Sequence, residues 1–116
     1  MHEQIHQYLQ EVAKRRDCTT YAEVAQLAHL DLAQSSERAK LDELLAEISI
    51  HEHEHGRPLL SAVVLYGQGE EMHPAFFQLA RELGLNQTND DLQFFIEELR
   101  RVHEYWSKVP PSEQKQ

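Results

Sequence analysis

The sequence predicts a single small α+β domain that is mostly helical. Apolar residues recur at spacings of three and four in five segments, which is the pattern of amphipathic helices, and one short segment is apolar throughout. The 116 residues suffice for one core but not for two, and 41% hydrophobic with 27% charged residues is typical of a globular chain. We expect the domain to span residues 1–109 and the tail, residues 110–116, to be disordered.

The first two predicted helices are short. Residues 3–16 carry one apolar stripe, and residues 21–28 carry another. Thr20 can cap the second helix with its hydroxyl, and Glu23, three residues further on, completes a capping box. The inward positions of both helices are Ile5, Tyr8, Leu9, Val12, Val24, Leu27 and Ala28.

The third predicted helix covers roughly residues 37–55 and is the longest. Ser35 or Ser36 can cap its start, Gly56 supplies the left-handed residue at its end, and Pro58 prevents its continuation. The buried face of this helix is defined by Leu41, Leu44, Leu45 and Ile48.

A buried strand is predicted over residues 59–66, because this segment is rich in valine and apolar on both alternating faces. Every strand needs a partner for its backbone groups. We expect that partner to be a short piece near residues 17–20, an extension after Gly69, or another copy of the chain.

Two further helices complete the domain. Pro74 starts the fourth, which ends at Gly84; residues 88–91 cap the fifth, which stops at Pro110 and Pro111. Their predicted inward residues are Phe76, Phe77, Ala80 and Leu83 in the fourth helix, and Leu92, Phe95, Ile96, Leu99, Val102 and Trp106 in the fifth.

The strongest chemical motif is the sequence HEHEH at residues 51–55, which contains H-E-x-x-H. On a helix, residues at i and i+4 share one face, so His51 and His55 could hold one Zn²⁺. Over these five residues the chain resembles the zinc motif of zincin metallopeptidases, with Glu52 acting on the metal-bound water. We expect His73 as a third ligand, with Glu70 and Glu71 as the other choices. We expect no cofactor, and zinc, the ion that this motif would hold, is the one alternative.

Helix geometry places Glu52 and His55 on the buried stripe of the third helix. A buried carboxylate and a buried imidazole must be paired. A Glu52–His55 pair, or contacts to Arg57 and the backbone, would make the arrangement structural. Alternatively, Glu52 and Arg57 form a catalytic set with His55 or His53, beside Ser61, for acid–base cleavage of a phosphodiester, in which Arg57 holds the phosphate.

The segment TTYAEVA, residues 19–25, resembles the T-x-Y-G-E-V-A segment in the DNA-binding domain of alkylguanine-DNA alkyltransferases and alkyltransferase-like proteins. The order continues similarly, with a polar loop, a helix opening near Arg38 and a strand beginning at Gly56. The resemblance covers about residues 17–66 and implies a winged-helix-like centre. The reactive Pro-Cys-His-Arg motif of that family is absent, and SAVV at residues 61–64 stands in its region, so the resemblance implies no alkyl transfer.

Charge and cysteine content restrict the partners. Eleven Lys and Arg residues against twenty Asp and Glu residues give a net charge of −9, which opposes non-specific nucleic-acid binding. The longest uncharged apolar run, residues 58–66, is too short to cross a bilayer. Cys18 is the single cysteine and no base is arranged beside it; with the start MHEQ lacking a signal-peptide pattern, we expect a cytoplasmic protein without a membrane partner.

These observations favour a non-enzymatic binding or regulatory module of bacterial type that acts through protein contacts. One alternative is a small hydrolase built on the Glu52 and His55 region, metal-dependent or metal-free. Another is sequence-specific DNA binding through the winged-helix-like segment. We also expect a homodimer, because an apolar strand edge and the aromatic residues Phe94 and Tyr105 outside the helix stripe invite a second copy.

Overall fold

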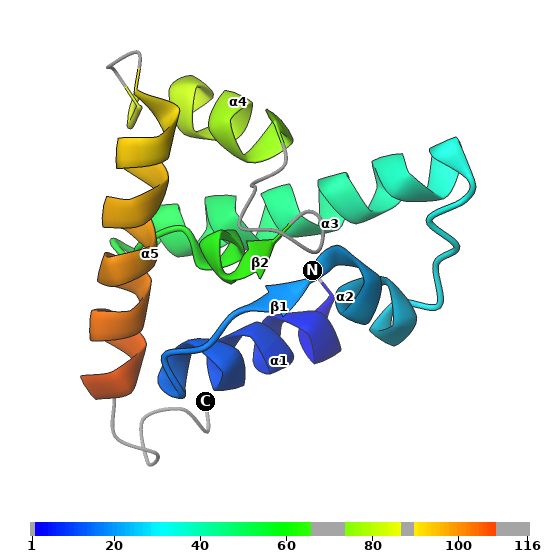
Figure 1. The fold of residues 1–116 in the computed structure, drawn as a ribbon, viewed down its shortest axis with the longest axis horizontal. Coiled ribbons are helices and arrows are strands. Elements are labelled where there is room, and N and C mark those ends of the chain that lie inside the picture. Colours follow the sequence, from blue (N-terminus) through cyan, green and yellow to red (C-terminus); the bar gives the residue numbers. More distant parts are fainter. Residues whose placement is uncertain (1, 66–73, 87–89, 109–116) are drawn as a thin grey trace.

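Five α-helices, among the residues that the structure describes, surround a short buried segment at the centre of the molecule (Figure 1). The structure is a computed structural model that describes residues 2–65, 74–86 and 90–108. The elements are α1 (Glu3–Lys14), β1 (Thr19–Thr20), α2 (Tyr21–Leu27), α3 (Ser35–Glu54), a 3₁₀ helix η1 (Leu60–Val63), β2 (Val64–Leu65), α4 (Pro74–Glu82) and α5 (Asp91–Lys108).

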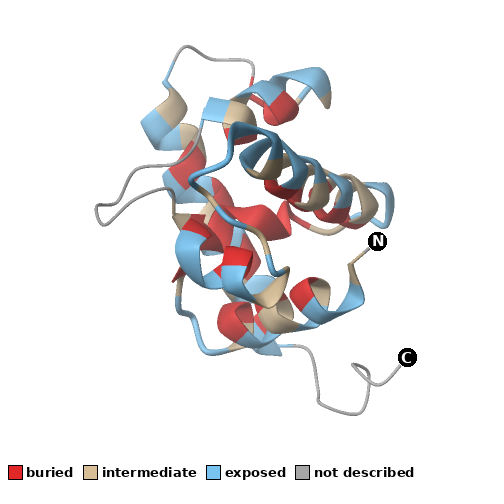
Figure 2. Cartoon of the chain, turned by 90° about the vertical axis from the view of Figure 1, so that its right-hand side faces the viewer, coloured by how far each residue is buried: buried red, intermediate tan, exposed pale blue. Residues whose placement is uncertain are grey.

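The predicted class, a small and mostly helical single domain with a minor β component, is confirmed. Helix α5 crosses the ends of α1 and α3, while α2 lies beside α1 and α4 lies beside α3 (Figure 1). Buried residues line the inward faces of the helices and the whole of η1 (Figure 2). The core is therefore one continuous cluster, to which all five helices contribute.

The first helices form as their sequence predicts. The amide of Glu23 donates to the Thr20 hydroxyl at 3.3 Å, which confirms the N-cap of α2. The predicted capping box is not completed, because the carboxylate of Glu23 accepts hydrogen bonds from the Thr19 hydroxyl at 2.8 Å and the Tyr8 hydroxyl at 3.0 Å instead of from the Thr20 amide. These bonds tie the start of α2 to α1 through the short strand between them.

The predicted strand over residues 59–66 is wrong for most of its length. Leu60–Val63 forms a 3₁₀ helix, and only Val64–Leu65 is a strand, which pairs in parallel with Thr19–Thr20. The expected partner near residues 17–20 is therefore confirmed, whereas residue 66 lies outside the described part. A short run of apolar residues is compatible with a buried strand and with a buried helical turn, so the periodicity of the sequence could not distinguish the two.

Helix α3 begins without the predicted serine cap. Its N-cap is Gln34, which makes no side-chain cap hydrogen bond, and the two serines belong to the first turn. Two side chains of that turn fasten the preceding loop instead: the Glu37 carboxylate accepts from the Asp31 amide at 2.8 Å, and Arg38 donates to the Leu32 carbonyl at 2.7 Å.

The end of α3 matches its prediction. Gly56 adopts a φ of +74°, which an L side chain rarely tolerates. The Gly56 amide donates to the His53 carbonyl at 3.1 Å, and the Arg57 amide donates to the Glu52 carbonyl at 2.9 Å. These two bonds satisfy carbonyls of the last turn and fix the direction in which the chain leaves the helix.

Helix α4 also follows its prediction, since Phe76 and Ala80 are buried and Gly84 ends the segment with a φ of +77°. The ring of Phe94 lies 5.9 Å from that of Phe76, centroid to centroid, so Phe94 packs within its own chain. The predicted turn after β2, the start of the α5 cap and the tail at residues 110–116 lie outside the described residues.

The buried face of α5 is only partly the predicted one. Val102 and Trp106 are buried as expected, but Leu92 and Ile96 are 65% and 52% exposed. Glu98 is buried in their stead, and its carboxylate accepts the Leu59 amide at 2.7 Å. Helix α5 is therefore rotated relative to the predicted orientation. In this orientation the Glu98 carboxylate satisfies the buried Leu59 amide, which would otherwise have no acceptor.

This rotation predicts an unequal response of α5 to truncation. Ile96→Ala is expected to change the free energy of unfolding by less than about 0.5 kcal/mol, whereas Val102→Ala should lower it by about 2 kcal/mol, because only the second change leaves a cavity. Urea unfolding of the two variants measures the difference. Equal losses would mean that Ile96 packs in the core after all.

Candidate functional site

Glu52, in the last turn of α3, is a carboxylate with no solvent-exposed surface. The guanidinium of Arg57 donates a hydrogen bond to each oxygen of Glu52: Nε donates to Oε1 at 3.0 Å, and Nη2 donates to Oε2 at 2.8 Å. Oε2 also lies 3.3 Å from Nε2 of His6, which belongs to α1. We call Glu52, His6, Arg57, His51 and His55 the Glu52 cluster.

Arg57 reaches Glu52 because of the turn that follows α3. The left-handed Gly56 reverses the chain, so that the side chain five residues after Glu52 folds back along the helix end. Tyr105 of α5 lies against the same guanidinium. The ion pair thus stands where α1, the end of α3 and α5 meet.

Three imidazoles continue the cluster toward the surface. The rings of His6 and His51 lie 5.5 Å apart, centroid to centroid, and those of His51 and His55 lie 4.3 Å apart. Nδ1 of His55 donates to the His51 carbonyl at 2.8 Å, because a carbonyl can only accept. In neutral His55 this bond leaves Nε2 with a free lone pair.

The surroundings lower two pKa values within the cluster, those of Glu52 and His51. Burial acts to raise the pKa of Glu52, but the hydrogen bonds from His6 and Arg57 and their positive charge outweigh it and hold the pKa below its ordinary value. Burial lowers the pKa of His51, and the neighbouring imidazole of His55 lowers it further. The cluster therefore favours an ionised carboxylate beside a neutral imidazole.

The structure brings together only part of the predicted site. Glu52 and Arg57 are in contact, which confirms the predicted pairing with Arg57, but the Glu52–His55 pair is wrong, because His55 is exposed and its Nδ1 bonds the backbone. Helix α3 ends at Glu54, one residue before His55. The ideal helical spacing that placed His55 on the buried face therefore does not extend to His55. His73 lies outside the described residues, as do Glu70 and Glu71.

Sequence reasoning missed His6. Its position on α1 flanks the apolar stripe of Ile5 and Leu9, and nothing local distinguishes it from a solvated histidine. Only the packing of α1 against the end of α3 gives it a role. The sequence contains one weak indication of this role, because a buried Glu52 carboxylate needs a donor in addition to Arg57.

The Glu52 cluster has donors that suit a divalent metal ion. One nitrogen of His6, one nitrogen of His51 and one oxygen of Glu52 all lie within 4.8 Å of one another. Imidazole and carboxylate are ordinary ligands of zinc. As the chain stands, Arg57 occupies both carboxylate oxygens.

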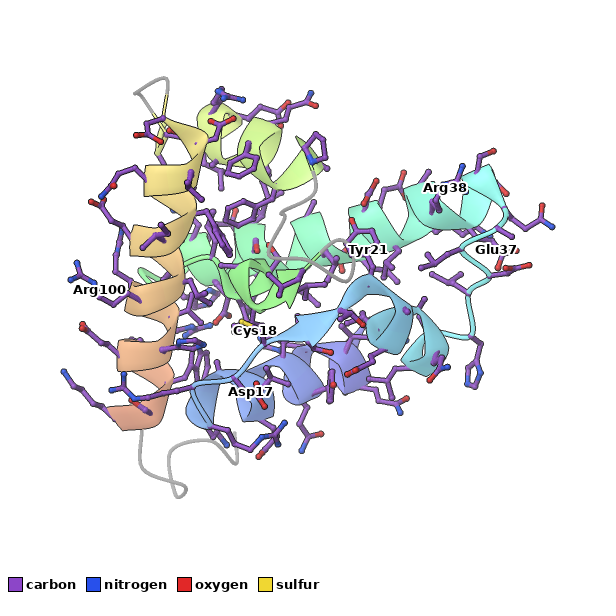
Figure 3. The ribbon with its side chains drawn as sticks, in the orientation of Figure 1. Asp17, Cys18, Tyr21, Glu37, Arg38 and Arg100 are labelled. Carbon is purple, nitrogen blue, oxygen red and sulfur yellow. The ribbon has the colours of Figure 1, made fainter. Side chains whose placement is uncertain are left out.

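Cys18 and Ser61 carry the thiol and the hydroxyl that could act as nucleophiles. Burial raises the pKa of the Cys18 thiol, and the charge of Asp17 raises it further, so the protonated form is favoured (Figure 3). The Ser61 hydroxyl is buried 2.6 Å from that of Ser49. The thiol is therefore held in its less reactive form, and the Ser61 hydroxyl is bonded within the interior.

No protein family, curated protein or solved structure that we compared matches this chain. Among the described residues, no helix is both long enough and apolar enough to cross a bilayer.

The pairing of Glu52 predicts a pH-dependent contribution to stability. Glu52→Gln should lower the free energy of unfolding by about 3 kcal/mol at neutral pH, because Arg57 loses a buried charged partner. In acid the unfolded chain takes up its proton near the ordinary pKa of 4.5, before folded Glu52 does, so the wild type loses this contribution as the pH falls below that value.

Urea unfolding from neutral pH to about pH 3 measures the effect. The gap between wild type and Glu52→Gln should narrow as the pH falls. Glu54→Gln is the matched control, because Glu54 is an exposed carboxylate on the same turn. A gap that stays constant in acid would contradict a lowered pKa of Glu52.

Proposed function

We propose that the protein is a non-enzymatic binding or regulatory module that acts through protein contacts. The observation that carries this proposal is an exposed apolar pair on α5, Leu92 and Ile96, which lie one helical turn apart. Arg100 follows one further turn along and points away from the body of the molecule (Figure 3). A protein segment with apolar side chains and a carboxylate fits this line of residues.

The internal use of the charged residues supports a non-enzymatic role. Glu52 is enclosed and bound by Arg57 and His6, and Glu98 is enclosed and bound to a backbone amide. A cavity of about 30 Å³ lined by Tyr21, Asp42, Ser61 and apolar side chains lies elsewhere, and it has room for roughly one water molecule. The carboxylates thus hold the fold together.

A photoreactive side chain on α5 tests the proposal. The cross-linker p-benzoylphenylalanine, placed at Leu92 or at Ile96 in living cells, should capture the same protein from both positions. Arg100→Glu should abolish the capture by reversing the charge that meets the partner's carboxylate. Mass spectrometry identifies the product, and a product of twice the chain's 13.6 kDa would identify a second copy as the partner.

Position Gln26 is the control, because it is exposed on α2, an element remote from α5 in Figure 1. The proposal fails if position 26 captures the same protein, or if capture from Leu92 and Ile96 survives Arg100→Glu. A homodimer has less support than the sequence indicates, since β1 covers the edge of β2 and Phe94 packs on Phe76.

A small hydrolase is the second candidate, and the Glu52 cluster is the observation that favours it. A neutral imidazole, a carboxylate and a guanidinium stand within a few ångströms, as acid–base cleavage of a phosphodiester requires. Purified protein would then hydrolyse bis(p-nitrophenyl) phosphate, and His51→Ala should remove this activity while His53→Ala retains it. Equal rates for both variants and a buffer blank would exclude this function.

DNA binding has the least support. The short strand before α2 and the α2–α3 arrangement are compatible with the winged-helix-like centre that the sequence resemblance implies. In Figure 3, Glu37 and Arg38 lie at the outer end of α3, where a recognition helix would need basic side chains. Arg38 is instead bonded to the Leu32 carbonyl, and the chain carries a net charge of −9.

A further inference from the structure

We propose that the Glu52 cluster is a binding site for a divalent metal ion of the zinc class, held by His6, His51 and Glu52. The inference is independent of the protein contacts proposed above. It also differs from the zincin arrangement, because Glu52 is a ligand rather than a base and one histidine comes from a different helix.

The distances between the donor atoms fit a tetrahedral metal site. In a tetrahedral site with bonds of about 2.0–2.1 Å, neighbouring ligand atoms lie about 3.4 Å apart. Nε2 of His6 and Oε2 of Glu52 are 3.3 Å apart, so they already span one edge of such a tetrahedron. A nitrogen of His51 lies within 4.8 Å of both atoms, and a small rotation of its half-exposed ring brings it to the ligand distance.

The hydrogen bonds around the histidines also suit metal binding. Metal-bound histidines commonly donate their other ring N–H to a carbonyl or carboxylate. The ion replaces the Nε2 proton of His6, which moves to Nδ1. The amide nitrogen of Gln10 lies 3.1 Å from Nε2 and 3.4 Å from Nδ1 of His6, so it must leave Nε2 to the ion, and the turned amide can accept the Nδ1 proton with its oxygen.

Charge determines how tightly the site binds. The ion contributes two positive charges, and Glu52 supplies one negative charge within the ligand set. Arg57 competes for the same carboxylate, because its Nη2 lies 2.8 Å from Oε2. Its Nε can keep Oε1, at 3.0 Å, while the ion takes Oε2. Removing the guanidinium should therefore strengthen metal binding, which a merely adventitious contact with surface histidines would not show.

Titration of untagged protein with ZnCl₂, followed by calorimetry, tests the proposal. We expect one Zn²⁺ per chain for the wild type. His6→Ala and His51→Ala should each weaken binding at least about tenfold, and Arg57→Gln should tighten it several-fold. His53→Ala is the matched control, because His53 lies on the same turn of α3 but outside the cluster, and its binding should equal that of the wild type.

Two further measurements keep the test independent of folding defects. Zn²⁺ should raise the melting temperature of the wild type and of His53→Ala but not of His51→Ala, since only a ligand of the folded state stabilises it. Co²⁺ should give the intense visible absorption of a tetrahedral site, lost in folded His51→Ala. The proposal is overturned if His51→Ala and His53→Ala bind Zn²⁺ equally, or if folded Arg57→Gln binds it more weakly than the wild type.

Discussion

The fold depends on the enclosure of one carboxylate, that of Glu52. An ionised carboxylate without exposed surface costs several kcal/mol unless its oxygens are bonded to cationic donors. Arg57 supplies two donors and His6 a third, so the requirement is met only when α1 packs against the end of α3 and the chain turns back after Gly56. One local charge thereby fixes the relative position of two helices and of the segment that follows.

A second buried carboxylate acts on the same segment from the other side. Glu98 of α5 accepts the Leu59 amide, two residues after the guanidinium that binds Glu52. The stretch from Arg57 to Leu59 is therefore held between α3 and α5. The 3₁₀ helix that begins at Leu60 enters the core with its direction already set, and the Ser49 hydroxyl accepts the Ser61 amide at 3.1 Å. Each polar group carried inward by this stretch thus meets a partner on a neighbouring helix.

This use of charge reverses the usual distribution of side chains on α3 and α5. Two glutamates are buried, while Leu92 and Ile96 remain on the surface. Because α5 must turn Glu98 inward to satisfy a backbone amide, two apolar residues of its predicted stripe turn outward. The same constraint that organises the core therefore creates the surface on which the proposed protein contacts rest. The imidazoles beside Glu52 lie next to the buried ion pair and are still partly exposed to solvent.

The sequence by itself determined the helical class, most helix ends and the burial of Glu52, because apolar spacing, the Thr20 cap and the left-handed Gly56 act within a few residues. Its prediction of the site reached Glu52, Arg57 and the neighbouring His51, which all lie between residues 51 and 57. Tertiary structure alone decided that His6 completes the pair, that residues 60–63 form a 3₁₀ helix, and that α5 is rotated toward Glu98. Those outcomes depend on atoms more than thirty residues apart finding hydrogen-bond partners in the interior, and no local pattern in the chain encodes such a match.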